Sequence, residues 1–303
     1  MAITLRDTIK NTVANHLDGG GLAFGQCLTA VGWVGGTLPE MYEEDGMVEL
    51  SMADVAGGAI VTGAGLSGKR PMYIIRYQGF NWYNCVSILN YACKSKDMWN
   101  IPCPIFVRSI AMEGAIGPVA GSSHHSLYHR MPGVKIYSPM TPGEYEQCYQ
   151  DFMKDDDVFY VSEHRGAYNN TEELDDVDFY DPDFVLFPIS ICRFAAMEAS
   201  RELFKEGIKV AVYHQKVLKP FDVNKNWARA LDIAGRGLVL DDDFPDGIAS
   251  TLAQKLMLES SAKVSTMGLE ERSSGFAKHL DNLPPSKEKI IRVIKNDISN
   301  KCR

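Results

Sequence analysis

Short apolar runs alternate with longer amphipathic stretches along the first half of the chain. Apolar runs occur at residues 22–25, 104–109 and 134–138. The second run is too short for a helix, and we expect all three to be buried strands. The stretches between them follow a helical pattern, beginning with residues 4–17. The alternation continues to about residue 164 and predicts a parallel sheet with helices on both faces.

The alternation is interrupted at residues 167–183, where polar and acidic side chains replace the apolar runs. A segment of this composition is typical of a linker. A second alternation of strands and helices begins at Phe184 and continues to the end of the sequence. The predicted fold class is therefore α/β, with two doubly wound domains at residues 1–166 and 184–303.

The stretch from Val48 to Phe80 departs from the ordinary amphipathic pattern. It is predicted to form strand, helix and strand, but the helix consists almost entirely of small residues and has no charge from Val55 to Gly68. A surface helix would carry charged residues on its outer face, so we expect this helix to be packed closely on all sides. Its one acid, Asp54, stands near its start, which on spacing alone favours a helix cap or a favourable charge at the positive end of the helix.

Composition excludes several classes of function. The formal net charge of −8 argues against nucleic acid as a partner, because phosphate binding needs a basic surface. No apolar run approaches the ~20 residues of a membrane span, and the N-terminal stretch lacks the apolar core of a signal peptide. The seven cysteines form no CxxC pair, which favours reduced thiols in a cytoplasmic protein.

Histidines cluster on one predicted loop. His124, His125 and His129 fall within six residues, after a glycine-rich loop that follows a strand. Loops at the carboxyl ends of parallel strands line the ligand crevice, so both a structural and a functional role remain open here. No HExxH pattern or zinc-type Cys/His spacing occurs, and we expect no metal site within this chain. GxSxG, GxGxxG and phosphate-loop motifs are absent as well.

The order of the motifs resembles a known family over nearly the full length. The chain is similar to the β subunits of thiamine-diphosphate-dependent 2-oxoacid dehydrogenase E1 components, a branch of the transketolase-like superfamily. The matching segments are SMADVAGGAIVTGAGLSGKRP, IIRYQGF, PIFVRS with the later HHS, MPGVKIYSPMTPGEYEQCYQDFMKDDDVFYVSEHR, KVLKPFD, GLVLDDDFPDGIAS and MGLEERSSGF. The resemblance implies a pyrimidine-binding domain followed by a transketolase C-terminal-like domain.

The resemblance also implies a catalytic acid. In this superfamily one carboxylate binds N1′ of the cofactor's aminopyrimidine and favours the tautomer that activates the thiazolium carbon; the cofactor then acts as an electron sink. Asp54 falls at the position of this acid, where the family normally has glutamate. An apolar site raises the pKa of such a carboxyl and allows it to share the proton.

Further cofactor and catalytic positions follow from the same resemblance. Tyr77 and Phe80 match the aromatic segment that packs on the aminopyrimidine ring, and Gln78 stands between them where relatives usually have another aromatic residue. Gln26 and Cys27 replace two acids that E1 β subunits often carry near the N-terminus.

The histidine loop also matches. His125, with Ser126, corresponds to a histidine proposed to handle protons of the bound intermediate, and His124 is the alternative for that role. Arg130 and Arg165 are candidates for substrate or partner contacts, although a surface ion pair is the simpler interpretation of each.

The resemblance implies a partner chain. The diphosphate and its Mg²⁺ need a GDG motif, which these 303 residues do not contain. We therefore expect an α subunit that carries this motif and holds the Mg²⁺, in an α2β2 assembly, with a small carbonyl compound as substrate and a lipoyl-bearing acyltransferase as a further partner. Two alternatives remain: a split transketolase or acyloin-forming enzyme acting on ketose or sugar substrates, and a non-catalytic β-like subunit.

Overall fold

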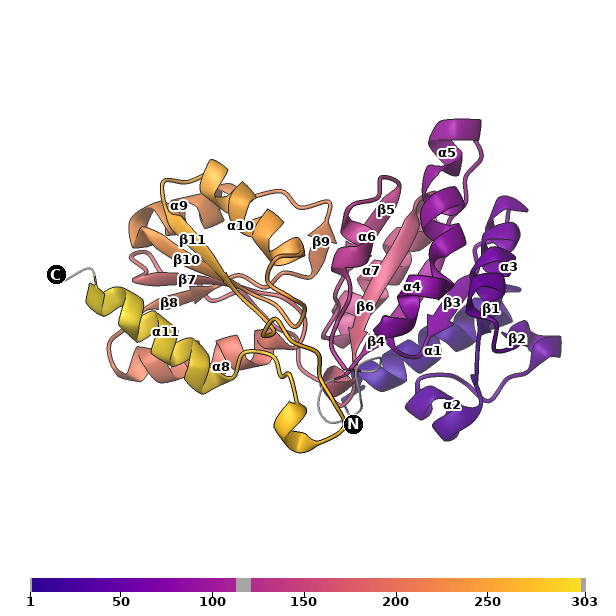
Figure 1. Ribbon diagram of the computed structural model, residues 1–303, viewed down its shortest axis with the longest axis horizontal. Helices are drawn as coiled ribbons and strands as arrows, with labels where there is room; N and C mark the ends of the chain where they lie inside the picture. Colours follow the sequence, from indigo (N-terminus) through magenta and orange to yellow (C-terminus); the bar gives the residue numbers. More distant parts are fainter. Residues whose placement is uncertain (1, 113–120, 301–303) are drawn as a thin grey trace. The chain divides into compact units, whose positions relative to one another are not determined.

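The computed structural model describes residues 2–112 and 121–300, and it divides into two compact units (Figure 1). Among the described residues, the first unit contains 2–112, 121–173 and 217–219, and the second contains 174–216 and 220–300. The change of unit falls inside the segment that the sequence predicts as a linker. The short strand at 217–219 returns to the first unit, whereas the sequence pattern places it in the second domain.

A seven-stranded sheet forms the centre of the first unit, in the order β2-β1-β3-β4-β6-β5-β9. All neighbours are parallel except β9, which pairs antiparallel with β5 at the edge. The predicted parallel sheet is therefore confirmed. The strands are β1 (Ala23–Gly25), β2 (Met47–Glu49), β3 (Met72–Ile75), β4 (Phe106–Ala111), β5 (Val134–Tyr137), β6 (Val158–His164) and β9 (Val217–Lys219).

Helices cover both faces of this sheet, which explains why β3, β4 and β6 are buried along their whole length. Phe106 packs against Phe152 of α7, whereas Tyr160, in register with Val107 on the other face, stacks on Tyr128 of α6. The helices of this unit are α1 (Leu5–Asp18), α2 (Ala30–Gly36), α3 (Asp54–Leu66), α4 (Asn81–Asn84), α5 (Cys93–Trp99), α6 (Ser126–His129) and α7 (Pro142–Lys154).

The segment predicted as one helix over residues 81–94 is broken into α4, a π-helical turn at Ile88–Ala92 and α5. The break follows Asn84, whose side chain accepts a hydrogen bond from the Tyr73 hydroxyl and donates one to the Phe80 carbonyl. These bonds tie the end of α4 to β3. Helical periodicity alone does not reveal such a tether.

The helix α3 is packed on one face only, so the prediction that it is enclosed on all sides is wrong within this chain. Its buried face is rich in glycine, and a side chain at Gly58 would place its Cβ 1.9 Å from the Asn84 carbonyl oxygen. The small residues therefore serve a close approach of α3 to α4. On the opposite face, Val55 and Ile60 are each about half exposed.

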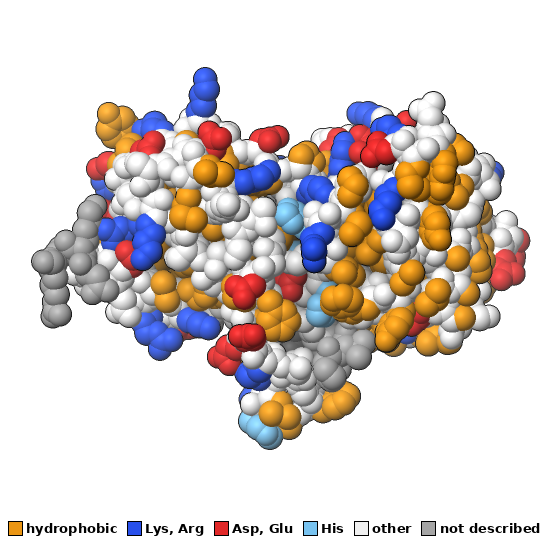
Figure 2. Space-filling view, turned by 45° about the horizontal axis from the view of Figure 1, so that its top comes forward, with side chains coloured by type: hydrophobic (Ala, Val, Ile, Leu, Met, Phe, Trp, Pro, Cys, Tyr) orange, Lys and Arg blue, Asp and Glu red, His pale blue; other side chains and the backbone are white. Residues whose placement is uncertain are grey.

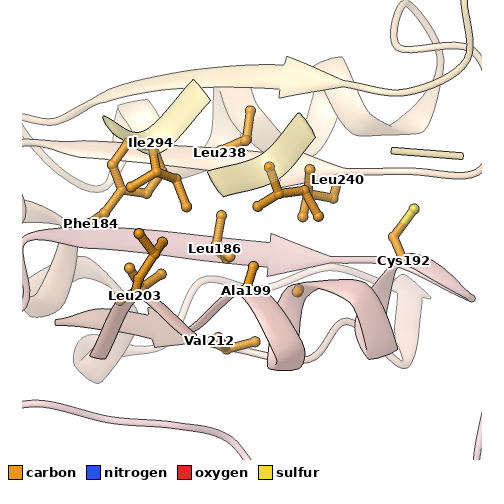
Figure 3. Close-up of a cluster of buried hydrophobic side chains, with 12 residues drawn as sticks. Phe184, Leu186, Cys192, Ala199, Leu203, Val212, Leu238, Leu240 and Ile294 are labelled. Atoms are coloured by element: carbon orange, nitrogen blue, oxygen red, sulfur yellow. The ribbon is translucent and has the colours of Figure 1, made fainter. Parts of the chain in front are cut away.

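The second unit is a four-stranded parallel sheet in the order β11-β10-β7-β8. Phe184, Leu186 and Leu238 of its strands pack with Leu203 of α8 and Ile294 of α11 in a buried cluster (Figure 3). Helices α9 and α10 cover the other face (Figure 1). The elements are β7 (Phe184–Pro188), α8 (Cys192–Lys205), β8 (Val210–Val212), α9 (Lys225–Ala234), β10 (Arg236–Leu240), α10 (Ile248–Leu258), β11 (Lys263–Met267) and α11 (Lys287–Asn300).

None of the helices in the described part of the chain could cross a membrane. In residues 2–112 and 121–300, each helix is either too short or too polar to cross a bilayer.

Candidate active site

A pocket opens where β1 and β3 end, within the first unit. Its empty volume is about 550 Å³, and it lies at the sheet edge where ligands of parallel sheets bind. Gln26, Tyr77 and Phe80, three of the residues predicted to bind a cofactor, line it together. The rings of Tyr77 and Phe80 lie 5.9 Å apart at an angle of 52°. We call this the aromatic pocket; its lining is Gln26, Cys27, Met52, Ile74, Ile75, Arg76, Tyr77, Phe80 and Asn84.

The side-chain amide nitrogen of Gln26 is a buried polar atom of the aromatic pocket. This Nε2 atom is buried and has no hydrogen-bond partner among the described residues. An unsatisfied buried donor costs about 1–3 kcal/mol, so an acceptor atom of a bound molecule would recover this energy. The neighbouring Cys27 adopts a left-handed backbone conformation (φ 53°), and its thiol lies 3.5 Å from the sulfur of Met52.

Asp54 is the first residue of α3, and it does not cap the helix. The N-cap position belongs to Ala53, which makes no side-chain cap bond, and the Asp54 carboxylate forms no hydrogen bond with the described residues. The cap hypothesis is therefore wrong. Asp54 is half-buried and lines a broad apolar hollow together with Tyr83. A carboxylate in the first turn is stabilised by the positive end of the helix and stays available to a ligand.

The hollow at Asp54 adjoins the aromatic pocket through Tyr73. Burial raises the pKa of the Tyr73 hydroxyl, and the charges of Cys85 and Asp54 raise it further. The hydroxyl donates a hydrogen bond to Asn84, which lines the aromatic pocket. A Cβ built on Gly57, one turn into α3, would lie 2.8 Å from this hydroxyl and 3.7 Å from Nε2 of Gln26. Asp54 and the Gln26 amide thus lie in the same region of the first unit, close to Tyr73.

Gln78 does not line the aromatic pocket, in contrast to its predicted place among the cofactor-binding residues. It is completely buried, because its amide forms three hydrogen bonds inside the protein. Its oxygen accepts the backbone N–H of His124 at 2.6 Å. Its nitrogen donates to Oγ of Ser162 at 2.8 Å and to the carbonyl of Ser109 at 3.2 Å. The same Oγ lies 3.2 Å from Nδ1 of His125.

The two predicted catalytic histidines are therefore held by one amide network. His125 is fully buried, and His124 is half-buried with its Nε2 3.4 Å from the Ser122 hydroxyl. The loop before them, residues 113–120, lies outside the described residues. Neither histidine lines the aromatic pocket or the Asp54 hollow. The structure thus distributes the predicted site residues over a pocket, a hollow and a hydrogen-bond network, and their catalytic and cofactor-binding roles stay predictions.

A buried ion pair supports the sheet next to this network. Arg108 of β4 binds both carboxylate oxygens of Glu163 on β6, at 2.6 and 3.0 Å, and Tyr145 and Tyr168 donate their hydroxyls to the same carboxylate. On the next residue of β6, burial lowers the pKa of His164 to about 4. Its Nδ1 accepts the Gly166 N–H at 3.0 Å, as expected for a neutral imidazole.

The sequence analysis does not identify two further residues near the site. Tyr83 is 63% exposed and faces the Asp54 hollow, and Ser162 connects Gln78 to His125. The spacing of Tyr77, Phe80 and Tyr83, three residues apart, is a signal from which Tyr83 could have been found. Ser162 lies in β6 between Val161 and Glu163, and only the fold brings it to the histidine loop.

The outer side of α3, α4 and α5 forms a large exposed apolar surface, which we call the α3–α5 surface. Monomeric proteins rarely leave such a patch in water. Figure 2 shows hydrophobic side chains gathered on the part of the view that belongs to the first unit. The exposed apolar residues here are Met52, Val55, Ile60, Trp82, Tyr83, Val86, Tyr91, Met98, Trp99 and Ile101.

Comparison with known proteins agrees with this architecture. Residues 30–171 match the family described as "Transketolase, pyrimidine binding domain". The chain is 24% identical over 260 residues to the 2-oxoisovalerate dehydrogenase subunit beta of Bacillus subtilis, covering 76% of each. It is 25% identical to the acetoin:2,6-dichlorophenolindophenol oxidoreductase subunit beta of Cupriavidus necator, covering 79% of this chain and 75% of that one. It is 24% identical to the pyruvate dehydrogenase E1 component subunit beta of B. subtilis, covering 72% of each.

A solved structure described as "Split gene transketolase, inactive beta4 tetramer" has the same fold. The TM-score is 0.73 at 14% sequence identity, and the match covers 99% of both chains. Residues 30–171 of the first unit thus resemble transketolase pyrimidine-binding domains. The chain is similar to the β subunits of 2-oxoacid dehydrogenase E1 components, which confirms the resemblance predicted from its motifs.

Proposed function

We propose that this chain is the pyrimidine-binding β subunit of a two-chain thiamine-diphosphate enzyme that decarboxylates a 2-oxoacid and transfers the acyl group. One observation carries the proposal. The Asp54 carboxylate and the buried Gln26 amide nitrogen of the nearby aromatic pocket both lack a hydrogen-bond partner among the residues that the structure describes. A ring that offers both a basic nitrogen and apolar faces would satisfy all three features.

The residues of the aromatic pocket fit the aminopyrimidine end of thiamine diphosphate. When bound, this cofactor supplies a carbon nucleophile and an electron sink for carbonyl chemistry. Tyr77 and Phe80 would enclose the ring, and the Gln26 amide would donate to an acceptor atom on it. Asp54 would hold the proton shared with the ring nitrogen.

Asp54 is one methylene shorter than the glutamate that the family normally uses. In this chain the Asp54 hollow is open. A partner chain that covered the hollow would exclude water from the carboxylate. Cofactor activation would then depend on assembly with the partner chain. A closer approach of α3 to the aminopyrimidine ring would compensate for the shorter side chain of Asp54.

The α3–α5 surface supports the need for a partner. It begins beside Asp54 and continues over α4 and α5. We propose that an α subunit carrying the GDG motif covers it, holds the diphosphate and Mg²⁺, and forms an α2β2 assembly; a lipoyl-bearing acyltransferase would accept the product. Because Cys27, Cys85, Cys93, Cys103 and Cys148 are not in disulfides, we also propose a cytoplasmic location.

The histidine network supports a role for His125 in proton handling, with His124 as the alternative. Gln78 fixes the backbone at His124, and Ser162 contacts the ring of His125. A histidine suits this task because its ordinary pKa lies near neutral pH. Gln78 and Ser162 therefore act as positioning residues for the histidine loop.

The second candidate function is a split transketolase or acyloin-forming enzyme acting on ketose or sugar substrates. The likeness to an acetoin oxidoreductase β subunit favours it, at an identity similar to that of the dehydrogenase relatives. A non-catalytic β-like subunit is the third. This third function does not explain why the Asp54 carboxylate and the Gln26 amide nitrogen both lack a hydrogen-bond partner among the described residues.

The test is reconstitution with the α chain, followed by titration with thiamine diphosphate and a screen of 2-oxoacids and ketose phosphates. We expect cofactor-dependent turnover of a 2-oxoacid. Turnover of ketose phosphates alone would select the second candidate. A complex that binds the cofactor and turns over neither class would support the third.

A further inference from the structure

We infer that Asn84 is a positioning residue of the aromatic pocket, which holds the ring of Phe80 in the place where a cofactor ring would bind. The inference rests on the proposed function, because it concerns the same site. Asn84 is the last residue of α4, is 4% exposed, and lines the pocket together with Phe80. Buried polar side chains are nearly always hydrogen-bonded, so the bonds of its amide show what this residue holds in place.

The side-chain amide of Asn84 has one orientation that satisfies both of its neighbours. Its Nδ2 donates to the carbonyl oxygen of Phe80 at 3.0 Å, and a carbonyl oxygen can only accept. The amide nitrogen must therefore face Phe80, which leaves the amide oxygen facing the hydroxyl of Tyr73. Because the amide oxygen can only accept, the hydroxyl proton of Tyr73 points at Asn84. The amide thus clamps Phe80, at the start of α4, to β3.

Asn84 also contacts the helix that carries Asp54. A Cβ on Gly58 would lie 1.9 Å from the backbone carbonyl oxygen of Asn84, so α3 and α4 touch backbone to backbone at this point. Asp54 is the first residue of α3, about one turn before Gly58. Tyr77 follows the end of β3 by two residues. The elements that carry Asp54, Tyr77 and Phe80 therefore meet at one asparagine.

The two bonds of the Asn84 amide distinguish it from the Gln26 amide. The Gln26 nitrogen has no partner among the described residues, whereas both polar atoms of Asn84 are already bonded within the chain. Asn84 therefore acts through Phe80, whose ring lies 5.9 Å from that of Tyr77. Without the clamp, Phe80 is free to leave this arrangement. Ordering the ring on binding then costs free energy, which weakens the affinity for the cofactor.

The affinity test uses the complex reconstituted with the α chain, titrated with thiamine diphosphate by calorimetry. Asn84→Leu is similar in size to asparagine and removes both hydrogen bonds. We expect a loss of about 10- to 100-fold in cofactor affinity, and a kcat at saturating cofactor within about threefold of wild type. A merely structural role would lower the unfolding midpoint without producing this separation of cofactor affinity from kcat.

Two further variants control for the loss of a buried bond. Tyr73→Phe removes the bond to β3 and keeps the bond from Asn84 to Phe80, so it should change cofactor affinity by less than about threefold. Asn282→Leu is the remote control. Asn282 is 6% exposed, and its amide bonds to the backbone of Glu270 and Arg272 in the second unit. Its variant should leave cofactor affinity unchanged.

A second readout needs neither the cofactor nor the α chain. Cys27 is half-buried and lines the same pocket as Phe80, so a displaced Phe80 opens a path to its thiol. In the isolated full chain, we expect Asn84→Leu to raise the rate of Cys27 alkylation by iodoacetamide about tenfold. The modified Cys27 peptide is quantified by mass spectrometry. Asn282→Leu should react at the wild-type rate.

The inference is overturned if Asn84→Leu binds thiamine diphosphate as tightly as wild type, or if Tyr73→Phe or Asn282→Leu weakens binding as much. A wild-type complex that does not bind the cofactor overturns the proposed function instead. The positioning role is then decided by alkylation of the isolated chain, where equal rates for Asn84→Leu and wild type overturn it. Faster alkylation that is confined to Asn84→Leu supports it.

Discussion

The side-chain oxygen of Gln78 accepts the backbone N–H of His124 at 2.6 Å, which joins the end of β3 to the histidine loop. We predict that Gln78→Leu lowers turnover of the reconstituted complex about 10- to 100-fold, since unpaired groups at His124 and Ser162 cost about 1–3 kcal/mol each. Cofactor affinity stays unchanged, because Gln78 lies outside the aromatic pocket.

A pH profile separates positioning from a merely structural role. Gln78→Glu keeps the acceptor for His124 but removes the donor to Ser162, whose Oγ contacts His125. The histidine limb of the pH–rate profile is therefore expected to shift in this variant. Gln78→Leu with wild-type turnover would contradict the assigned role.

The Arg108–Glu163 pair is expected to dominate the stability of the first unit. Breaking a buried ion pair leaves an uncompensated charge and costs about 3–5 kcal/mol, so Glu163→Gln should lower the unfolding midpoint in urea strongly. The matched control is Glu270→Gln, which removes the charge of an exposed pair with Arg272 and should leave the midpoint unchanged. Equal midpoints for both variants would show that the ion pair between β4 and β6 does not stabilise the first unit.

His164 makes stability depend on pH. Burial lowers its pKa to about 4 in the folded protein, from an ordinary value of 6.5. Between these values the unfolded chain is protonated and the folded chain is not. This contribution is therefore complete above pH 6.5 and is lost as the pH falls to 4, by about 3 kcal/mol. Urea unfolding at pH 7, 5.5 and 4 should show a shallower loss for His164→Asn than for wild type. Parallel curves would contradict the prediction.

The α3–α5 surface is expected to be an assembly surface. Ile60→Asp places a charge on its half-exposed apolar face, where a central contact contributes about 2 kcal/mol or more to association. We predict at least a tenfold weaker association with the α subunit by sedimentation, and an isolated chain that folds normally. Leu258→Asp, at an apolar residue of the second unit that is 75% exposed, is the control. Equal association of both variants with the α subunit would place the partner elsewhere.

The regular elements of this fold could be predicted because their signals are local. The apolar run that becomes β4 is buried on both faces and needs no context. The break after Asn84 depends on a hydrogen bond from Tyr73 of β3. The residues from Val31 to Gly35 have left-handed backbone angles, and the Gly35 carbonyl accepts a hydrogen bond from Arg6. Periodicity carries no information about either.

Motif order leads the sequence analysis to Asp54, Tyr77 and Phe80, and the structure places Tyr77 and Phe80 on one pocket. Their roles toward the cofactor stay predictions. The burial of Gln78 could not be predicted, because it depends on Ser109 and Ser162, which only the fold brings to its side chain. The open face of α3 was missed for a related reason: a helix of small residues looks the same whether its own chain or a partner covers it.

The most direct test of the account is the turnover of Asp54 variants in the reconstituted complex, with thiamine diphosphate affinity measured in parallel. Asp54→Asn keeps the size of the side chain and removes its charge, so it should lower kcat about 100-fold or more, since it removes the proton-holding group. Asp54→Glu restores the carboxylate and should retain activity within about tenfold. Turnover of Asp54→Asn equal to wild type, at unchanged cofactor affinity, would contradict the central claim that this carboxylate activates the cofactor.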